Sequence, residues 1–441
     1  MADSCRDKGM IVSDLCREAI RLGACIALAA TVFSGPAHAR AHTPGGDRPN
    51  ALSCTAKLDD AAIAEIDRLA EGKIRSEQLP GGFTIALVCD GKIVKMSGYG
   101  FADEAHTIRM PADAVFPVAS LTKTMTAFLA VKLAARGVVS LDAPIERYLP
   151  STARLSPSLV ARPVTLETLL LHTAGWPRDP STRRNLLVES PHGFDPTILD
   201  PDSATVDRLY TALATDRAAG PPGVRRYSNM GYDVAGHVLE RASGKSYARL
   251  LSDELTGPLG MTDTVVDRLQ TMEARVPAGY SFDPTVRQLF RTPNWRSGEL
   301  KGAAGVSSTA PDLARYLALL IDQTRLSAVL GGTEAVDTLL RPRLEYFDGP
   351  HALFAQALGW RMSHFGQYGN VYSHTGDADS HHAFLAFSPE RRVGLVVLST
   401  NGKDAMNELG DDILLHLFQR MKPLDAPAPS PSINRGKGIL Q

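Results

Sequence analysis

The chain has 441 residues and 44% of them are hydrophobic, which is enough apolar material for one large domain or two smaller ones. Charged residues make up 22%, and the formal net charge is -1. The chain therefore lacks the basic field that attracts nucleic acid and the Lys/Arg-rich run of a polybasic membrane contact. This balance favours a globular protein whose partners are small molecules or peptides.

The N-terminus has the pattern of an export signal. A basic lead-in and a short apolar stretch, "RLGACIALAATVF" (21–33), precede the small residues "AHA" at 37–39. This predicts a signal peptide over 1–39, with Ala39 the last residue removed, and an exported, periplasmic or secreted protein. The apolar stretch is too short to span a bilayer comfortably. The lead-in is unusually long and partly acidic, so a later translation start such as Met10 stays open.

Two cysteines, Cys54 and Cys89, remain after removal of such a signal. In an oxidising compartment they can form a disulfide, and the alternative is two separate buried thiols.

The first part of the mature chain predicts a linker, a helix and a hairpin. Residues 40–57 are rich in Pro, Gly and Arg, and apolar residues recur at helical spacing over 58–74. Residues 82–100 predict two strands, because Asp90-Gly91 stands between alternating apolar runs. A further helix is expected from about Ser120 to Gly137.

The middle of the chain, from about 140 to 290, predicts helices and loops. Residues 176–203 read as a long loop or lid, and 228–245 as a helix with a glycine stop. Strands return at 381–389 and 392–401, a closing helix follows over 404–421, and the Pro-rich tail 422–441 is expected to be disordered.

This order predicts an α+β fold over 58–421. The late strands and the early hairpin would form one antiparallel sheet in an α/β part, 58–118 and 300–421. A mostly helical part, 119–299, would be inserted between them. A ligand crevice is expected where the two parts meet.

The helix that begins "VASLTKTMTAFLA" (118–130) carries Ser120 and Lys123 three residues apart. Residues at i and i+3 share a helix face, so the lysine reaches the serine oxygen. A serine hydroxyl becomes a good nucleophile when a base takes its proton, and burial lowers the pKa of a lysine enough to allow this. The spacing is common by chance, so it needs support from other motifs.

Two more stretches supply that support. "RRYSNMGYDVAG" (225–236) presents Tyr227 and Asn229 before a helix, and "YSHTGDADSHHAFLAF" (372–387) presents His374-Thr375-Gly376 at a predicted strand start. With "SLTK", "YSN" and "HTG" in this order, the chain resembles the serine β-lactamase and penicillin-binding-protein superfamily. It is most similar to the class C branch, which also holds D,D-carboxypeptidases, D-aminopeptidases and esterases. Similar landmarks, such as "LLLHTAGWP" (169–177), extend the resemblance from about residue 58 to 421.

The resemblance implies a role for each matching residue. Ser120 would be the acylated nucleophile, Lys123 would hold or take its proton, and Tyr227 would act as general base or acid. Asn229 would bind the substrate's amide carbonyl and steady Lys123. The remaining matches are His374 and Thr375, which would line the site, and the backbone N–H groups of Ser120 and of Asp377 after Gly376, which would form the oxyanion hole.

Structural alternatives stand beside these roles. Tyr227 is alternatively an ordinary packed tyrosine, and Asn229 is alternatively the N-cap of the helix that follows it. For His172 a structural role, in a buried loop hydrogen bond, is favoured over a catalytic one. Trp176 and Trp295 are either core residues or pocket walls.

The third motif departs from that of class C β-lactamases, which carry lysine where this chain has His374. His-Thr-Gly is more usual in peptidase-like and esterase-like members. Asp377 and Asp379 then place negative charge where a substrate carboxylate would bind. This disfavours carboxylate-bearing substrates and suits an amine unless a cation compensates. The candidate cations are Arg178, Arg183 and Arg184.

No cofactor is expected. Asp377, Asp379, His381 and His382 carry side chains that can bind metal, but neighbouring strand residues point to opposite faces, so His381 and His382 do not easily share one ion. The sequence thus predicts a serine hydrolase that acts through an acyl-enzyme on an amide or ester, most similar to D,D-peptidases or esterases. A class C-type β-lactamase and a penicillin-binding sensor without turnover are the alternatives.

Overall fold

The computed structural model describes most of the chain between Cys54 and Met421. The described residues are Cys54, 58–77, 81–183, 185–190, 193–199, 205–266, 268, 270–283, 288–292, 296, 298, 301–348, 352–378 and 380–421. Contacts divide the chain into two units, Met1–Asn50 and Ala51–Gln441, and all the described residues belong to the second. The predicted signal peptide, nearly all of the linker, the tail and Trp295 lie outside the described residues.

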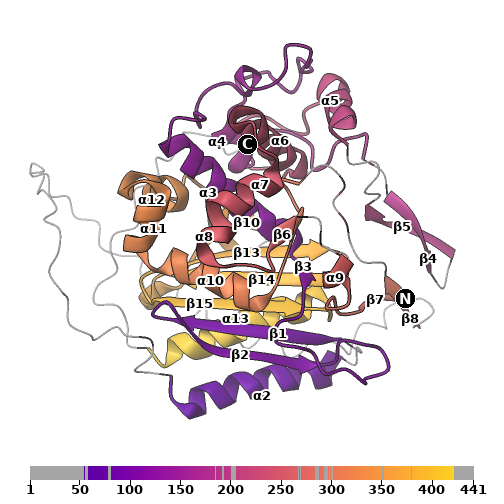
Figure 1. The fold of residues 1–441 in the computed structure, drawn as a ribbon, viewed down its shortest axis with the longest axis vertical. Coiled ribbons are helices and arrows are strands. Elements are labelled where there is room, and N and C mark those ends of the chain that lie inside the picture. Colours follow the sequence, from indigo (N-terminus) through magenta and orange to yellow (C-terminus); the bar gives the residue numbers. More distant parts are fainter. Residues whose placement is uncertain are drawn as a thin grey trace, which may run out of the picture. The chain divides into compact units, whose positions relative to one another are not determined.

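The centre of the fold is an eight-stranded sheet in the order β10-β11-β12-β13-β14-β15-β1-β2. Every neighbouring pair in it is antiparallel. Its strands are β1 Gly82–Cys89, β2 Lys92–Gly100, β10 Leu344–Asp348, β11 Ala352–Ala357, β12 Trp360–His364, β13 Asn370–Ala378, β14 His381–Ser388 and β15 Val393–Ser399. Because β1 pairs with β15, the two ends of the domain lie side by side in one sheet (Figure 1). This confirms the predicted antiparallel sheet made from both chain ends.

The early hairpin forms for the predicted local reason. Asp90 and Gly91 have φ values of 52° and 77°, the two positive values that a tight hairpin turn requires. The sequence did not predict β10, β11 or β12, and its pattern indicated a strand start at His374-Thr375-Gly376. These three residues instead lie inside β13.

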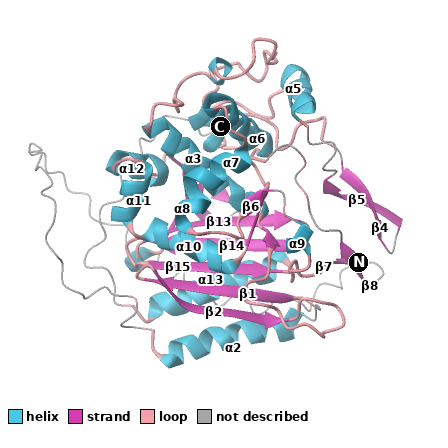
Figure 2. Ribbon diagram, in the orientation of Figure 1, coloured by secondary structure: helices cyan, strands magenta, loops and turns pink. Residues whose placement is uncertain are grey.

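Two hydrophobic cores lie on the two faces of the sheet. Along β1, Ile85 and Leu87 belong to the core under α2 Asp60–Glu77 and α13 Lys403–Gln419. Ala86 and Val88 belong to the larger core under the remaining helices. This alternation is the two-residue period of a strand that is buried on both sides. The domain therefore has a helix–sheet–helix arrangement (Figure 2).

The helices of the larger layer are α3 Thr122–Ala135, α4 Leu166–Leu170, α5 Val206–Thr215, α6 Asn229–Ser243, α7 Tyr247–Leu251, α8 Gly257–Leu259, α9 Gln270–Glu273, α10 Ala310–Ile321, α11 Gln323–Leu330 and α12 Thr333–Leu340. Shorter helical turns are η2 Ala119–Leu121, η3 Ile145–Arg147, η5 Ser252–Thr256 and η6 Gly366–Tyr368. The α10 helix packs on β1 and β15, and α13 packs on the opposite face of β14 and β15. The predicted closing helix and the helix with a glycine stop are α13 and α6, and Gly244 ends α6 with a φ of 70°.

Among the described residues, three small sheets lie outside the central one. They are β3 Phe116–Pro117 with β9 Val306–Ser308 and β6 Val265–Val266, the hairpin β4 Asn185–Ser190 with β5 Gly193–Leu199, and the hairpin β7 Gly279–Asp283 with β8 Gln288–Thr292. The long loop or lid expected over 176–203 therefore contains regular structure that was not predicted, because the β4–β5 hairpin lies within it. Its strands contain Pro196 and Asp195, which weaken the strand signal in the sequence.

Several smaller expectations are resolved by side-chain contacts. Trp176 is a core residue whose indole N–H donates to the Leu159 carbonyl at 3.0 Å. Cys54 and Cys89 form a disulfide, with Cα atoms 5.4 Å apart. Within the described ranges, no helix combines the length and apolar character needed to cross a membrane.

The disulfide joins positions separated by 35 residues. Closing a loop of that size removes freedom from the unfolded chain, so the bond is expected to contribute about 3 to 4 kcal/mol to the free energy of unfolding. Urea unfolding of the Cys54→Ser/Cys89→Ser variant should show this loss. Reductant should lower the free energy of unfolding of the wild type and leave that of the double variant unchanged. A double variant as stable as the oxidised wild type would contradict the expectation.

Candidate active site

Ser120 lies in η2, at the point where β3 leads into α3. The residue before it, Ala119, has a φ of 43°, a left-handed conformation that is uncommon for a residue with a side chain. The α-helix itself begins only at Thr122, two residues later than the sequence predicted. A strained residue directly before a candidate nucleophile is typical of functional sites, where the surrounding structure holds the strain.

Lys123 is completely buried and its amino group has two hydrogen-bond acceptors. Its Nζ atom donates to the Ser120 Oγ at 3.0 Å and to the Ala303 carbonyl at 2.8 Å. The same atom lies over the rings of Tyr227 and Tyr232, at 4.9 Å and 5.6 Å from their centroids. The predicted contact between Ser120 and Lys123 is therefore present.

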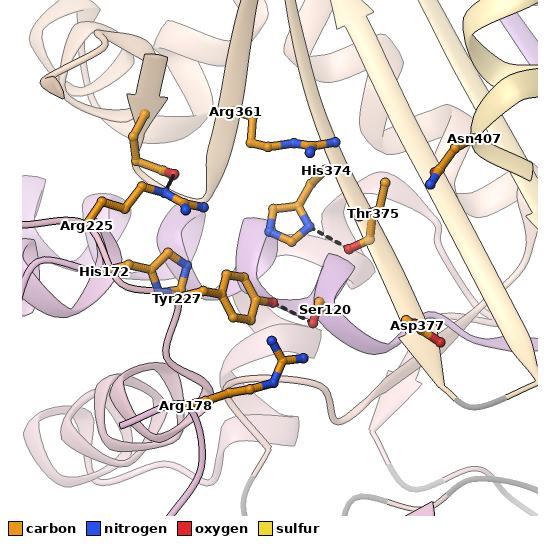
Figure 3. Close-up of a pocket in the computed structure, with 11 residues that line it drawn as sticks. Ser120, His172, Arg178, Arg225, Tyr227, Arg361, His374, Thr375, Asp377 and Asn407 are labelled. Carbon is orange, nitrogen blue, oxygen red and sulfur yellow. Dashed lines mark hydrogen bonds between the residues drawn. The ribbon is translucent and has the colours of Figure 1, made fainter. Parts of the chain in front are cut away.

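Tyr227 reaches the same serine from the segment that leads into α6. Its hydroxyl donates to the Ser120 Oγ at 2.7 Å (Figure 3). Because Lys123 donates to the same oxygen, Ser120, Lys123 and Tyr227 form one cluster. The Tyr227 ring packs against the imidazole of His172, with ring centroids 4.5 Å apart. This contact, together with the hydrogen bond, orients Tyr227 toward the serine.

His172 has the structural hydrogen bond that the sequence predicted. Its Nδ1 accepts from the backbone N–H of Ser228 at 3.1 Å. Burial, reinforced by the charges of Arg225 and Lys123, holds the pKa of His172 well below its ordinary value. The ring is thus neutral and acts as a packed support for the segment before α6.

The helix cap beside the cluster is Ser228, so the alternative that Asn229 caps α6 is wrong. Ser228 Oγ accepts from the Gly231 N–H at 2.9 Å and donates to the Pro177 carbonyl at 2.6 Å. The Asn229 side chain instead donates to Asp179 at 2.9 Å. Asn229 is absent from the described residues that line the cavity, and none of its described hydrogen bonds reaches Lys123.

The third motif lies on β13, next to η2. A Cβ atom on Gly376 would lie 2.1 Å from the Val118 carbonyl oxygen and 3.4 Å from the Ser120 nitrogen, so only glycine fits. This close approach brings the backbone that leads to Asp377 beside the Ser120 N–H. The two N–H groups predicted for the oxyanion hole therefore belong to neighbouring segments.

His374 is buried and donates through Nδ1 to the Thr375 carbonyl at 2.7 Å. Burial, assisted by the charge of Lys123, lowers the pKa of His374 to about 3. The ring is therefore neutral near pH 7, whereas the lysine that class C β-lactamases carry here would add a positive charge.

A cavity of about 450 Å³ opens at this cluster (Figure 3). Its lining residues are Ser120, His172, Arg178, Arg225, Tyr227, Gln356, Arg361, His374, Thr375, Asp377 and Asn407. The crevice expected between the two parts of the domain is therefore present. Of the predicted site residues, Ser120, Tyr227, His374, Thr375 and Asp377 line it, while Lys123 lies beneath Ser120.

Four further lining residues were not predicted from the sequence: Arg225, Arg361, Gln356 and Asn407. Arg225 stands two residues before Tyr227, so its position in "RRYSN" was an available signal. Its Nε donates to the Gln356 side chain at 2.8 Å, and its guanidinium stacks on Tyr346 at 3.6 Å. Arg361 had no such signal, because it reaches the site through the pairing of β12 with β13, opposite Ser373.

The charge of the cavity is the reverse of what the motif alone indicated. Arg178, Arg225 and Arg361 line it, and Asp377 is the one carboxylate among its described lining residues. Asp377 also lies 3.3 Å from His382 Nδ1. Asp379 and Arg184 lie outside the described residues. The expected repulsion of carboxylates is thus offset by arginines.

Arg183 does not supply this compensation. Its guanidinium lies 3.3 Å from Asp179 and 3.4 Å from the buried Asp233, and its side chain is almost fully buried. The strand residue His381 is also buried, and its Nε2 lies 2.9 Å from the Pro277 carbonyl. In the part of the chain that the structure describes, no three His, Cys, Asp or Glu residues are placed to hold a metal ion.

An antiparallel sheet between helical layers, with a serine, a lysine and a tyrosine joined at one cavity, is the arrangement of serine hydrolases of the β-lactamase/transpeptidase type. The sequence model of the Beta-lactamase family matches residues 66–419, so the chain belongs to that family.

Relatives with assigned names are similar over most of the chain. The D-alanyl-D-alanine-carboxypeptidase/endopeptidase AmpH of Escherichia coli (strain K12) is 28% identical over 78% of this chain and 86% of its own length. Protein flp of Staphylococcus aureus (strain N315) is 22% identical over 80% of this chain and 66% of its own.

Solved structures share the fold at lower identity. The octameric penicillin-binding protein homologue from Pyrococcus abyssi has a TM-score of 0.65, is 21% identical, and matches 81% of this chain and 77% of its own. The β-lactamase/D-alanine carboxypeptidase from Yersinia pestis, complexed with citrate, has a TM-score of 0.64 and is 24% identical. That match covers 82% of this chain and 100% of the Yersinia chain.

The lowered pKa of His374 predicts a pH dependence of stability. An unfolded histidine titrates near pH 6.5, whereas folded His374 titrates near 3, so the unfolded chain binds an extra proton between these values. The free energy of unfolding should therefore fall as the pH drops from about 6.5 toward 3. In His374→Asn the loss between pH 7 and pH 5 should be smaller by about 2 kcal/mol. Urea unfolding at both pH values measures this, with the exposed His364→Asn as the control; equal losses in all three proteins would contradict it.

Proposed function

We propose that this protein is an exported D,D-carboxypeptidase-like serine peptidase that works through an acyl-enzyme on peptides with a free C-terminal carboxylate. The observation that carries the proposal is the position of the Ser120 Oγ between Lys123 Nζ and Tyr227 Oη, inside a cavity with three arginines. The first feature supports attack by the serine, and the second supports an anionic substrate.

In the proposed acylation step, the Ser120 Oγ forms a bond to the scissile carbonyl carbon while its proton passes to the Lys123 amino group, either directly or by relay through the Tyr227 hydroxyl, which passes its own proton on to Lys123. The backbone N–H groups of Ser120 and Asp377 would donate hydrogen bonds to the developing oxyanion, which is the usual source of much of the stabilisation in acyl transfer. Tyr227 would return a proton to the leaving amine as the C–N bond breaks. Water then hydrolyses the ester on Ser120 by the reverse sequence of proton transfers.

In this proposal Asn229 has a supporting role. Its side chain donates to Asp179, which also pairs with Arg183, and this links the start of α6 to the loop beside the cavity. His374, neutral and buried, and Thr375 shape the wall on the β13 side, next to the proposed carboxylate site.

The arginines support a charged substrate over a neutral ester. A carboxylate in a cavity with limited water gains far more from a guanidinium than it does in bulk solvent, especially through paired N–H···O contacts. Arg361 lies across from Ser373 in the sheet, and His374 and Thr375 follow directly. We therefore assign the C-terminal carboxylate to Arg361 and Thr375. The name of the Escherichia coli relative, a D-alanyl-D-alanine carboxypeptidase/endopeptidase, agrees with this substrate class.

β-Lactam hydrolysis is the second candidate, because penicillins and cephalosporins carry a carboxylate next to the scissile amide and suit the same arginines. The Yersinia pestis structure with this fold is described as a β-lactamase/D-alanine carboxypeptidase. The two activities differ in how fast water releases the acyl group, and a penicillin-binding sensor would release it hardly at all.

Export is supported by the signal-like sequence at 1–39 and by the Cys54–Cys89 disulfide, since structural disulfides persist in oxidising compartments.

Intact mass after incubation with a penicillin tests the nucleophile. A peptidase that deacylates slowly should carry one penicillin per chain, and Ser120→Ala should carry none, because the attacking oxygen is gone. Consumption of penicillin without a lasting adduct would favour the β-lactamase instead. An adduct that persists in Ser120→Ala would reject Ser120. The mass of the secreted chain also tests export, because removal of the predicted signal peptide leaves a chain that begins after Ala39.

Arg361→Gln tests the carboxylate assignment. The measured quantity is kcat/KM for an acyl-D-Ala-D-Ala peptide with a free C-terminus, compared with its C-terminal amide. Loss of a charge-assisted hydrogen bond of about 1.5 to 3 kcal/mol should lower the preference for the free acid by roughly 10- to 100-fold. Arg341→Gln, on the surface outside the cavity, is the matched control, and an unchanged preference in Arg361→Gln would contradict the assignment.

A further inference from the structure

The arginines of the cavity lie on two sides of the candidate nucleophile. Figure 3 shows Arg361 and Arg225 on the side of His374, and Arg178 on the other side of Tyr227 and Ser120. One carboxylate per substrate would use only the first side. The second side therefore raises the question of what Arg178 binds.

Arg178 is held in place through both its backbone and its side chain. Its carbonyl oxygen accepts from the N–H groups of Asn229, at 2.7 Å, and Met230, at 3.1 Å, so its backbone is fixed at the start of α6. Its guanidinium lies over the Tyr227 ring, 5.2 Å from the centroid, and points toward Ser120 (Figure 3). A cation held in this way is ready to bind an anion without much further ordering.

Asp179 forms a long ion pair with Arg178 that offsets only part of its charge. Asp179 lies 3.6 Å from the Arg178 Nε, which is too long for a hydrogen bond. Asp179 also accepts from the Asn229 side chain at 2.9 Å and from Arg183 at 3.3 Å. Its charge is thus shared with a second arginine, while the Arg178 side chain remains 71% exposed at the cavity wall.

The direction of the substrate follows from the proposed function, on which this inference rests. In this arrangement the C-terminal carboxylate binds at Arg361 and Thr375, and the scissile carbonyl lies at Ser120. The N-terminal part of the bound peptide must then extend to the opposite side, where Arg178 lies. We propose that the substrate carries a second anionic group, on the residue before the one that is acylated onto Ser120, and that Arg178 binds it.

Asp377 is the group that opposes this proposal, because it also lines the cavity and would attract an amine. It lies 3.3 Å from His382 Nδ1, and its side chain is 47% exposed, so its charge is partly screened. The described lining holds three arginines against this single carboxylate. The balance favours an anion on the substrate.

The test uses three peptides, acetyl-X-D-Ala-D-Ala with X = Glu, Gln or Lys, and measures kcat/KM for release of the last D-alanine. Glu and Gln have nearly the same shape and differ in charge. The wild type should prefer Glu over Gln by about ten-fold or more, the factor that one charge-assisted hydrogen bond supplies. Arg178→Gln should bring the ratio near one, and Arg178→Lys should give an intermediate value. Arg162→Gln, an exposed arginine elsewhere, is the control and should keep the wild-type ratio.

The outcomes separate this inference from the function on which it rests. Equal rates with Glu and Gln, or a preference for Lys, overturn the second anion site and leave the peptidase intact; the Lys result would assign this side to Asp377. A wild-type ratio in both Arg178 variants overturns the assignment to Arg178. No release from any peptide by a wild type that penicillin still acylates overturns the peptidase proposal, and this inference with it. Penicillin adducts also show that each variant is folded.

Discussion

The burial of the Lys123 amino group is the constraint on which the rest of the site depends. An amino group removed from water is costly unless hydrogen bonds replace the lost solvent, and here the partners come from distant segments. Ser120 is three residues away, Ala303 supplies a carbonyl from the segment before β9, and two tyrosine rings flank the group. These contacts can form only after α3, α6 and the 301–305 turn have packed together.

The same packing requires backbones to approach more closely than side chains allow. A Cβ atom on Gly302 would lie 2.2 Å from the Tyr232 carbonyl oxygen, and one on Gly376 would lie 2.1 Å from that of Val118. The first contact holds the Ala303 carbonyl against α6, and the second holds β13 against the start of α3. Asp233 reinforces the first, since it accepts from the Ala303 N–H at 3.1 Å. The site therefore joins three segments through fixed backbone contacts, which suits chemistry that needs preorganised donors.

The sequence predicted those parts of the fold and site whose signals are local. Asp90-Gly91 marked the first hairpin, and Ser120 with Lys123 needed only one turn of helix. Arg361 and the strands β10–β12 were missed because their positions depend on pairing between strands. The β12 segment "WRMSH" has only one fully buried residue, so it lacks the alternation of a half-buried strand. Asn229 was misjudged because Ser and Asn are both good caps, and only the geometry decides between Ser228 and its neighbour.

The features that distinguish substrates within this family lie in side chains that the fold does not dictate. Each of the three arginines has an aromatic ring beneath it: Tyr227 for Arg178, Tyr346 for Arg225 and Phe354 for Arg361. An aromatic ring beneath a guanidinium reduces the side-chain freedom that binding of an anion would otherwise remove. The rings come from the segment before α6, from β10 and from β11. The proposed anion preference of the cavity would thus depend on the same helix start and sheet edge that position Tyr227, which would link the choice of substrate to the geometry of the proposed chemistry.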